Sequence, residues 1–482
     1  MIGALPRLSL SSVLVPWCLS EPSHAALAVQ ESKKVSFFAD VRPILQQHCH
    51  GCHQPAKTSG EVVLTSFASL MSAAGSSAEP LVVPGRPDDS LIHQVIVANE
   101  DKPPQMPKDR PPLDAASVQK LRDWIAQGAA DDTPKSSMVQ YNKENPPAYA
   151  QPPVISSLDH SPDGSLLAVS GYHEVLLYSR DGALVDRWIG LSERIQSLAF
   201  SPDGSMLAAA GGQPARMGEL QIWRVEDGEL LLSLPVTFDS LYGASWSPDG
   251  DLVAFGCSDN TVRAVEAASG EQVLYQGAHE DWVLDTVFSA DGSHLVTVSR
   301  DRSMKLISVA TQQFIDNISS ITPGALKGGL ICVDRHPEKD ELLIGGADGT
   351  PKIYQMHRTK ERRIGDDFNL IRAFEAMPGR VFAVEWSRDG TKVAAVSSTG
   401  ESGELCVFEA ADGKRLASWH SAAPLYALSF RPDSSGLSIG GADGVVRCFD
   451  LAAQAFVQEW IVMPSSSAGP AVVETAVSGG GS

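Results

Sequence analysis

Two cysteines and a histidine stand at a short, fixed spacing near residue 50. Cys49 and Cys52 are separated by two residues and His53 follows at once, in the run Cys49-His50-Gly51-Cys52-His53. Two thiols at this spacing can each form a thioether with one vinyl group of a single porphyrin, and the adjacent imidazole can bind its iron. Cys-x-x-Cys-His is the attachment pattern of c-type haem. The sequence therefore predicts one covalently bound haem c per chain.

Two other kinds of site use part of this pattern. A thioredoxin-like dithiol needs a βαβ setting, and a structural zinc site needs a second Cys or His pair at suitable spacing. No βαβ pattern surrounds residue 50, and His48 and His50 adjoin the cysteine loop instead of forming a separate pair. Haem attachment is the interpretation that accounts for both cysteines and the histidine.

A sixth iron ligand must come from elsewhere in the same domain. Methionine opposite histidine is common in cytochromes c and raises the reduction potential. Met106 lies in the proline-rich run Lys102–Lys108, whose prolines stiffen the loop before the last predicted helix. Met71 falls in a helical pattern typical of core packing. We predict Met106 as the ligand, with His93 or an open iron site as the alternatives.

Two predicted helices flank the motif. The first covers residues 37–47, begins near Asp40 because its proline is tolerated only in a first turn, and ends at the cysteines. The second runs from Asp114, an N-cap residue, to Gly128, a stop signal. Residues 29–133 are therefore expected to form a small all-α haem domain. The predicted apolar faces are Phe38, Val41, Ile44 and Leu45 in the first helix, and Val118, Leu121, Trp124 and Ile125 in the second.

Four runs in this part of the chain form a specific combination. They are Val41–His53, Ser59–Leu64, Val83–Leu91 and Gln105–Pro107. With them the region from Phe37 to Ala129 resembles the cytochrome c-like domain of planctomycete and related bacterial proteins. The resemblance implies haem binding through Cys49 and Cys52, with His53 and Met106 as axial ligands. The chain departs from the pattern at Glu61-Val62, where such proteins often have Gly and a basic residue, and no ligand lies there.

A four-residue turn recurs along the rest of the chain. Ser-Pro-Asp-Gly or a variant of it lies between apolar, strand-like runs at seven positions, 40 to 51 residues apart. Seven repeats of this length predict a seven-bladed β-propeller with four strands in each blade. The turns begin at Ser161, Ser201, Ser247, Ser289, His336, Ser387 and Arg431.

Residues 153–463 also resemble WD40-repeat propellers. Phe449-Asp450 comes closest to the Trp-Asp signature, and Gly277-Ala-His279 is similar to Gly-His. The erosion of these signatures leaves the fold prediction intact and the usual buried Asp–His network open. Such propellers are mostly binding platforms, so the resemblance implies docking of a partner protein, although a fold alone does not give a function.

The propeller sequence shows no catalytic triad, phosphate-binding loop or carboxylate pair. Its histidines are scattered, about one in each repeat, as is typical of ordinary blade residues. A second haem bound through them, as in propeller-type nitrite reductases, is the alternative. Four cysteines are predicted to be buried thiols, with a disulfide as the alternative in an oxidising compartment. They are Cys257, Cys332, Cys406 and Cys448.

The formal net charge of −20 argues against nucleic acid as a partner, because phosphate binding needs clustered Lys and Arg. Residues 137–482 carry −18 of this charge. We interpret this acidic body as a solubility feature, with docking of a basic partner as the alternative.

Residues 1–28 are predicted to be an export signal. Arg7 precedes the short apolar run Leu8–Leu19, and Ala26-Leu27-Ala28 fits a cleavage site between small residues. Bacteria attach c-type haem outside the cytoplasmic membrane, which agrees with export. The apolar run is shorter than the roughly 20 residues that span a bilayer, and no other segment is long enough. We expect a bacterial periplasmic or cell-envelope protein without an integral membrane span.

The expected order is a signal peptide (1–28), a haem domain (29–133), a proline-rich linker (134–152), the propeller (153–463) and a disordered tail (464–482). We predict that the protein transfers single electrons and that the propeller docks an unidentified redox partner. The protein would then be an electron carrier and not a catalyst of its own. The alternatives are a haem-dependent enzyme, peroxidase- or reductase-like, and an interaction protein in which the haem is sensory or structural.

Overall fold

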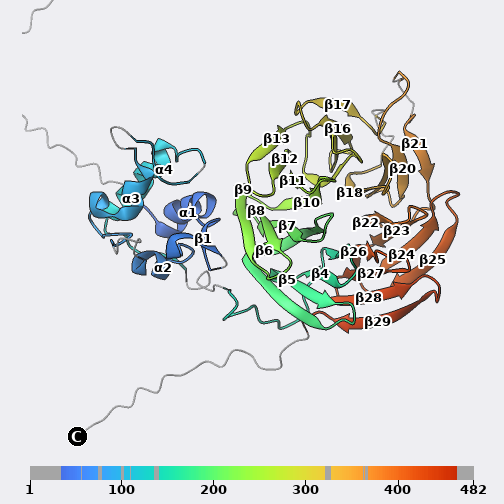
Figure 1. Cartoon of the computed structure of the whole chain (residues 1–482), viewed down its shortest axis with the longest axis horizontal. Helices are drawn as coiled ribbons and strands as arrows, with labels where there is room; N and C mark the ends of the chain where they lie inside the picture. The colour runs from blue at the N-terminus through green and yellow to red at the C-terminus, as the bar shows by residue number, and fades with distance from the viewer. Residues whose placement is uncertain are drawn as a thin grey trace, which may run out of the picture. The chain divides into compact units, whose positions relative to one another are not determined.

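Helices form the first part of the chain and antiparallel β-sheets form the rest (Figure 1). The predicted signal peptide and tail lie outside the described residues, as do residues 135–140 of the predicted linker. None of the helices that the structure describes is long and apolar enough to cross a bilayer. This computed structural model describes residues 34–55, 57–73, 79–98, 102–108, 110–134, 141–320, 327–361, 363 and 367–463.

The N-terminal domain is mainly helical, as predicted, with one short strand pair in addition. β1 (His53–Gln54) and β2 (Lys57–Thr58) run antiparallel directly after the cysteine motif. The helices are η1 (Phe37–Val41), α1 (Arg42–His48), η2 (Ser59–Glu61), α2 (Phe67–Ser72), η3 (Pro87–Asp89), α3 (Leu91–Ile96) and α4 (Ala115–Ala126).

The first predicted helix begins earlier than expected. It starts at Phe37 instead of Asp40, as one π-helical turn that continues into α1, and Pro43 lies in the first turn of α1. Ser36 caps the start by accepting a hydrogen bond from a backbone N–H of the first turn. The earlier start places Phe37 on the core face, where it is 3% exposed, and leaves Phe38 only partly buried. The prediction of Phe38 as the core residue was therefore wrong.

The second predicted helix is confirmed. The carboxylate of Asp114 accepts the N–H of Ser117 at 2.9 Å, and the chain leaves α4 at Gly128 with a φ of +98°. A left-handed φ suits glycine, which has no Cβ to clash with the backbone. Trp124 packs against Phe37 with ring centroids 5.4 Å apart, so α4 and η1 share one apolar core.

The second part of the chain forms sheets in which strands neighbouring in sequence also pair. Five sheets have four strands each, and β3 to β9 form one seven-stranded sheet. The long strand β6 pairs with β5 through its first half and with β7 through its second half, so it links two four-strand groups. These four-stranded antiparallel groups agree with the predicted propeller class.

The strand bounds follow in chain order. The seven-stranded sheet contains β3 (Leu158–His160), β4 (Leu166–Ser170), β5 (Tyr172–Ser179), β6 (Leu184–Phe200), β7 (Met206–Gln213), β8 (Met217–Arg224) and β9 (Leu230–Thr237). The next two sheets contain β10 (Leu241–Trp246), β11 (Leu252–Cys257), β12 (Val262–Glu266), β13 (Gln272–Gln276), β14 (Val283–Phe288), β15 (His294–Ser299), β16 (Met304–Ser308) and β17 (Phe314–Asn317). The last three contain β18 (Leu330–Arg335), β19 (Glu341–Gly346), β20 (Lys352–Gln355), β21 (Leu370–Ala373), β22 (Arg380–Trp386), β23 (Lys392–Ser398), β24 (Gly403–Glu409), β25 (Arg415–Ser421), β26 (Leu425–Phe430), β27 (Gly436–Gly441), β28 (Val445–Asp450) and β29 (Ala455–Ile461).

The recurring turn joins the first two strands of each group, and five of its seven copies share the same serine–aspartate hydrogen bond. In the first copy, the Ser161 hydroxyl donates to Asp163 at 2.6 Å and accepts the N–H of Leu166 at 2.9 Å. Gly164 supplies the positive φ of +70° that the turn needs. The same Ser–Asp bond recurs in the copies that begin at Ser201, Ser247, Ser289 and Ser387.

Side chains of the first strand in each group bond to the first strand of a neighbouring group. The Asp285 carboxylate on β14, for example, accepts the N–H of Val333 on β18 at 2.9 Å. Six further bonds of this kind join the remaining neighbours, and one of them joins the last sheet to β3. They are Asp159 with Phe200, Ser197 with Ala244, Thr286 with Gly243, Asp334 with Trp386, Glu385 with Phe430, and Ser429 with His160.

Part of the predicted linker is fixed to the sheets. The Tyr149 hydroxyl donates to Glu174 on β5 at 2.7 Å, and the Arg187 guanidinium contacts both oxygens of the same carboxylate at 2.7 Å. Arg187 also donates to the carbonyl of Pro147 at 2.8 Å. Since the side chain of Glu174 is fully buried, this two-oxygen ion pair anchors residues 147–149 to β5 and β6.

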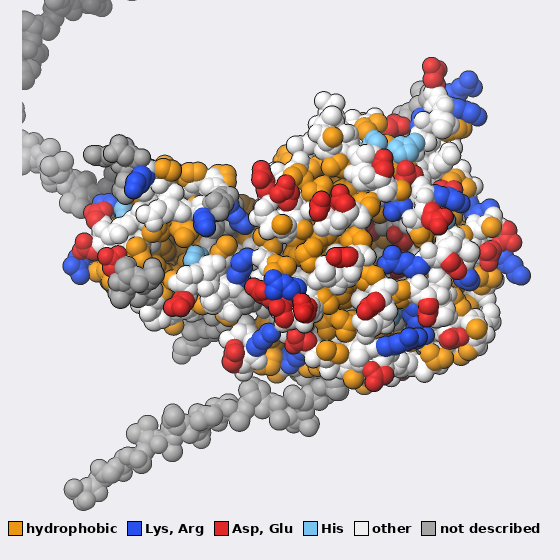
Figure 2. Space-filling view, viewed as in Figure 1, with side chains coloured by type: hydrophobic (Ala, Val, Ile, Leu, Met, Phe, Trp, Pro, Cys, Tyr) orange, Lys and Arg blue, Asp and Glu red, His pale blue; other side chains and the backbone are white. Residues whose placement is uncertain are grey.

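The four cysteines of this region are buried, and none forms a disulfide among the described residues. Burial raises the pKa of the Cys257 and Cys406 thiols to about 12. The prediction of buried free thiols is confirmed. Charged side chains of both signs are interspersed on the face of the sheets seen in Figure 2.

The hydrogen bonds between sheets predict a measurable pH effect. Burial raises the pKa of Asp285 from 3.8 to about 7. Between these values the native carboxyl keeps a proton that the unfolded chain has lost, so its contribution to the free energy of unfolding falls as pH rises. Asp285→Asn removes this slope. Because the residue also lines a water-accessible cavity, we expect the wild type to lose only on the order of 1–2 kcal/mol of stability relative to the variant as the pH rises from 4.5 to 8. The variant also loses one acceptor oxygen, which shifts its stability by the same amount at every pH.

Chemical denaturation at several pH values measures this difference. The control is Asp291→Asn, in an exposed turn where hydrogen bonds from serines lower the carboxyl pKa. Asp291 is ionised in both states over this pH range, so its removal should leave the slope unchanged. Parallel profiles for wild type and Asp285→Asn would contradict the assignment.

Candidate functional site

The Cys–x–x–Cys–His motif forms a tight turn where α1 ends. The N–H groups of Cys49 and His50 both donate to the carbonyl of Leu45, at 2.8 and 2.9 Å. Those of Cys52 and His53 both donate to the carbonyl of Cys49, at 3.1 Å. The backbone therefore holds both thiols and the imidazole within one five-residue turn, as attachment of a single group requires.

The ring of His53 is oriented by a backbone carbonyl. Its Nδ1 lies 3.3 Å from the carbonyl oxygen of Val62, and the N–H of Leu64 donates to the carbonyl of His53 at 2.9 Å. A ligating histidine usually donates its other ring N–H to such an acceptor, which fixes the tautomer. Burial lowers the His53 pKa and outweighs the opposing effect of the Val62 carbonyl. The lowered pKa favours the neutral ring, which is the form that can bind a metal.

His50 has a different role in the same turn. It is 3% exposed, and its Nε2 lies 2.9 Å from the carbonyl of Leu64. Burial lowers its pKa to about 3, so the ring stays neutral. His50 and His53 together attach the segment 62–64 to the motif, and His50 uses its Nε2 in doing so.

The two thiols differ in their surroundings. Cys49 packs against the apolar core of the domain, and burial raises its pKa to about 12, whereas Cys52 is exposed. A group bound to both would have one edge against the core and one edge toward solvent. This arrangement fits a largely apolar macrocycle with a polar margin.

Met106 has an anchored backbone and a side chain outside the core. The N–H groups of Gln105 and Met106 both donate to the carbonyl of Val95 in α3, at 2.9 and 3.0 Å. The Met106 side chain is 36% exposed, while Met71 packs against the core as predicted. His93 is 7% exposed, with its Nδ1 3.9 Å from a carboxylate oxygen of Asp88. Met106 therefore fits the role of a ligand that a bound group would order.

Two polar atoms that the sequence did not single out adjoin this site. Gln54 Nε2 and Thr65 Oγ1 are buried and have no hydrogen-bond partner among the described residues. They follow His53 and Leu64, which are hydrogen-bonded to each other. An unpaired buried polar group costs about 1–3 kcal/mol.

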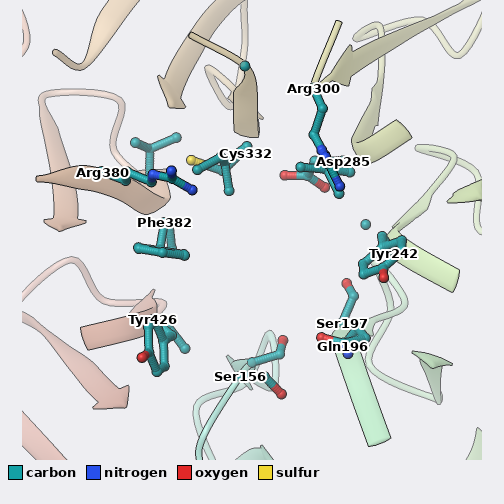
Figure 3. Close-up of a pocket in the computed structure, with 18 of the residues that line it drawn as sticks. Ser156, Gln196, Ser197, Tyr242, Asp285, Arg300, Cys332, Arg380, Phe382 and Tyr426 are labelled. Carbon is teal, nitrogen blue, oxygen red and sulfur yellow. The ribbon is translucent and has the colours of Figure 1, made fainter. Parts of the chain in front are cut away.

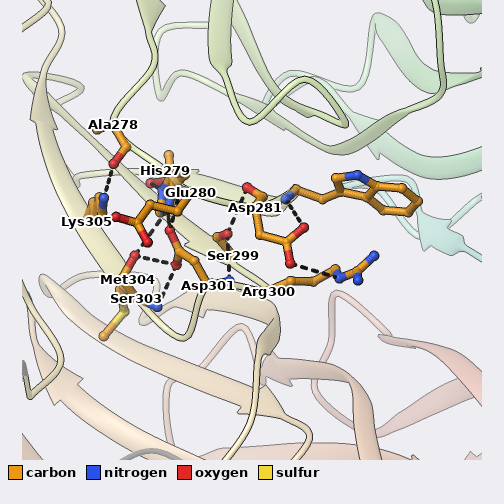
Figure 4. A network of polar contacts seen from close by, with 12 residues as sticks. Ala278, His279, Glu280, Asp281, Ser299, Arg300, Asp301, Ser303, Met304 and Lys305 are labelled. Atoms are coloured by element: carbon orange, nitrogen blue, oxygen red, sulfur yellow. Dashed lines mark hydrogen bonds and ion pairs between the residues drawn. The ribbon is translucent and has the colours of Figure 1, made fainter. Parts of the chain in front are cut away.

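One repeat of the sheet region has a buried Asp–His network (Figure 4). His279 Nδ1 lies 2.9 Å from the Asp301 carboxylate, and its Nε2 lies 2.7 Å from the Thr297 hydroxyl. Asp301 also accepts hydrogen bonds from the N–H of Glu280 and from Ser303. The network that the eroded signatures left open thus forms at Gly277-Ala-His279, where the sequence is closest to Gly-His.

Family models match both parts of the chain. Residues 49–110 match the model described as planctomycete cytochrome C. Residues 228–264, 270–308 and 413–450 match the WD domain, G-beta repeat. The chain joins a planctomycete-type cytochrome c domain to WD40 repeats. The first is a haem-binding type of domain and the second a protein-interaction type, which confirms the predicted combination.

The matched segments include the site residues. The cytochrome c match contains Cys49, Cys52, His53 and Met106, and the second WD40 match contains the His279 network. The matches do not themselves assign a ligand role to any of these residues.

Curated relatives are similar over part of their length. Eukaryotic translation initiation factor 3 subunit I from Danio rerio is 23% identical over 224 residues, which are 46% of this chain and 55% of the relative. The proteins of the same name from Aspergillus terreus and Coccidioides immitis are 31% and 32% identical over 112 residues. Those segments are 23% of this chain and 32% and 31% of the relatives. The chain thus spans between a third and about half of these relatives.

The unequal surroundings of the two thiols predict unequal reactivity in haem-free protein. The thiolate is the nucleophile, and the raised pKa keeps Cys49 almost fully protonated at pH 8. We expect iodoacetamide to alkylate the exposed Cys52 at least about tenfold faster than Cys49, as measured by peptide mass spectrometry. The buried Cys257 is the internal control for a slow thiol. Equal rates at Cys49 and Cys52 would show that Cys49 is not held in the core.

Proposed function

We propose that the protein is an exported c-type cytochrome that carries one covalent haem and transfers single electrons, with its propeller docking the redox partner. The main support is the Cys49–His53 turn within the cytochrome c match, in which the Val62 carbonyl lies 3.3 Å from Nδ1 of His53 and orients the ring. Haem c supplies one-electron redox chemistry when bound. The haem domain is then the relay, and no catalytic step is assigned to the chain.

The proposed roles of the site residues are as follows. Cys49 and Cys52 hold the cofactor through thioethers, and His53 and Met106 are its axial ligands. His50 keeps the segment 62–64 against the turn, so that the Val62 carbonyl meets the His53 ring. A His/Met ligand pair favours a higher potential than most other pairs and leaves no open iron position, which suits a relay.

We also propose that residues 153–463 close into a seven-bladed ring. Dividing β6 between two blades gives seven groups of four strands, and each neighbouring pair has a side-chain hydrogen bond between first strands. The bond from the His160 N–H to Ser429, and that from the Ile155 N–H to the Gly441 carbonyl, support closure of the last blade onto the first. The last blade has its own outer strand, β29, so the first segment supplies none.

Export follows from the chemistry of attachment. Residues 1–28 have the sequence pattern of a secretory signal, and thioether formation in bacteria takes place outside the cytoplasmic membrane. We therefore assign the protein to the periplasm or cell envelope. Translation initiation, named by the relatives, is not carried over, because their similarity covers at most 46% of this chain.

Covalent attachment is tested by producing the full chain in a bacterial host that matures cytochromes c. Wild type should gain the mass of one haem, resist acid–acetone extraction of the haem and lack residues 1–28. Cys49→Ala/Cys52→Ala should lose the covalent mass entirely. Cys257→Ala, which removes a buried thiol of β11, is the matched control and should keep it. Colourless wild-type protein without the added mass would overturn the proposal.

The axial ligand is tested by Met106→Ala beside Met71→Ala. We expect Met106→Ala to change the spectrum from six-coordinate low-spin to five-coordinate high-spin, and to lower the potential by on the order of 100 mV, within the roughly 0.8 V that axial ligands span. Met71→Ala should keep the low-spin spectrum. If Met106→Ala leaves the spectrum unchanged, His93→Ala identifies the alternative ligand. A high-spin wild type would instead favour an enzyme with an open iron.

A further inference from the structure

The sheets surround a cavity of about 1070 Å³ (Figure 3). It exceeds the roughly 300–1,000 Å³ of most small-molecule sites. One lining residue from each of the strands β6, β10, β14, β18, β22 and β26 shows how the wall is built. These residues are Ser197, Tyr242, Asp285, Cys332, Phe382 and Tyr426.

Aromatic rings form two flat parts of the wall. Tyr242 and Trp282 stack with centroids 5.8 Å apart, and Phe382 and Tyr426 meet edge to face at 5.1 Å. In Figure 3 Tyr242 lies across the space from Phe382 and Tyr426. Such rings offer large, rigid apolar surfaces at low entropic cost to a ligand.

Two arginines point into the same space (Figure 3). Arg300 lies over the Trp282 ring, 4.6 Å from its centroid, and pairs with Asp281 at 3.5 Å. Arg380 is exposed and forms no ion pair with another residue that the structure describes. Its guanidinium is therefore available for a planar, two-pronged contact with a carboxylate.

The two acidic side chains of the wall differ in their partners. Asp281 pairs with Arg300, whereas Asp285 is hydrogen-bonded to the backbone. The lining contains three cations, Arg300, Lys327 and Arg380, and two acids, Asp281 and Asp285. Both oxygens of Asp285 already accept backbone N–H groups, from Thr286 and Val333, at 2.9 Å. The cavity is thus locally cationic inside a body whose net charge is strongly negative.

We propose that this cavity binds an extended segment of the partner protein that carries an Asp or Glu carboxylate next to an aromatic or aliphatic side chain. Arg380, assisted by Arg300, holds the carboxylate, and the aromatic pairs hold the apolar neighbour. The volume and the open aromatic walls favour a peptide over a small metabolite. This inference rests on the docking part of the proposed function and names the chemistry of the docked segment.

The test uses the full-length, haem-loaded protein and a displayed library of random hexapeptides flanked by Gly-Ser. Selected peptides should share one Asp or Glu beside an apolar residue. The best of them, synthesised with a fluorophore and blocked ends, should lose at least tenfold in affinity with Arg380→Gln and with its own acid changed to the amide. Arg300→Gln should weaken binding as well, by severalfold.

Arg415→Gln is the matched control, because Arg415 lies on β25 outside the cavity lining and makes an ordinary surface pair with Glu375 at 3.3 Å. It should leave the affinity unchanged, and thermal unfolding should show that all three variants are folded. Selected peptides without a shared carboxylate, peptides that bind Arg380→Gln as tightly as wild type, or a library that yields no binder would each overturn the inference.

The same experiment separates this inference from the proposed electron relay. Peptide binding is also measured with Cys49→Ala/Cys52→Ala, which lacks covalent haem. If wild-type protein proves to be haem-free and still binds the acidic peptide, the proposed electron relay is overturned and the inference about the cavity stands. Haem-loaded protein that selects no acidic peptide would overturn the inference and keep the relay.

Discussion

The turn from Cys49 to His53 is the constraint on which the haem domain depends. The carbonyl of Leu45 in α1 accepts two N–H groups, and the carbonyl of Cys49 accepts two more, so the chain reverses within five residues. The same turn ends a helix, spaces two thiols and begins β1. It also brings the segment 62–64 to the histidine ring, because β1 and β2 pair directly after it. Each bond is worth only about 1 kcal/mol, but together they define the position of the ligand.

In the sheet region, Asp285 both joins two neighbouring sheets and lines the cavity. First-strand carboxylates such as Asp285, Asp334 and Glu385 accept backbone N–H groups of the neighbouring sheet. Burial raises the pKa of each of these carboxyl groups. These three carboxyl groups therefore serve the architecture, and Asp285 is the one of them that lines the cavity, where Arg300 and Arg380 also lie. The proposed carboxylate site thus lies in a protein of acidic composition.

Local signals in the sequence were sufficient for much of this structure. The Ser–Asp turn needs only residues within six positions of each other, and the caps of α4 lie at its ends, so both were predictable. The π-helical turn at Phe37 was not, because it changes which phenylalanine faces the core without a distinctive residue. The bond from Val333 to Asp285 spans 48 positions and obeys no spacing rule. The anchor of Tyr149 to Glu174 and Arg187 was likewise not predictable, because Tyr149 lies in a proline-rich segment that suggested a linker and its partners lie 25 or more positions away on β5 and β6.

The haem site likewise has some features that could be predicted from the sequence and others that only the structure shows. Cys49, Cys52 and His53 were evident because their chemistry requires those side chains at that spacing. The carbonyl of Val62 carries no side-chain signal, since every residue has one, and only the fold shows which carbonyl meets the ring. Gln54 and Thr65 are common polar residues, and their unpaired buried atoms become meaningful only once burial is known.

The proposed combination of an electron-transfer domain with a partner-docking domain has a physical consequence that neither domain has alone. Under the proposed function, a partner docked on the sheet region would meet the haem domain at an effective concentration and not at its own bulk concentration. Long-range attraction by the acidic body favours a partner with a basic surface. The proposed cavity site would require a carboxylate at contact range, and screening over roughly 8 Å at physiological salt separates the two requirements. A protein that meets only one of them is either not attracted or not anchored, so selectivity arises from demanding opposite charges at different distances.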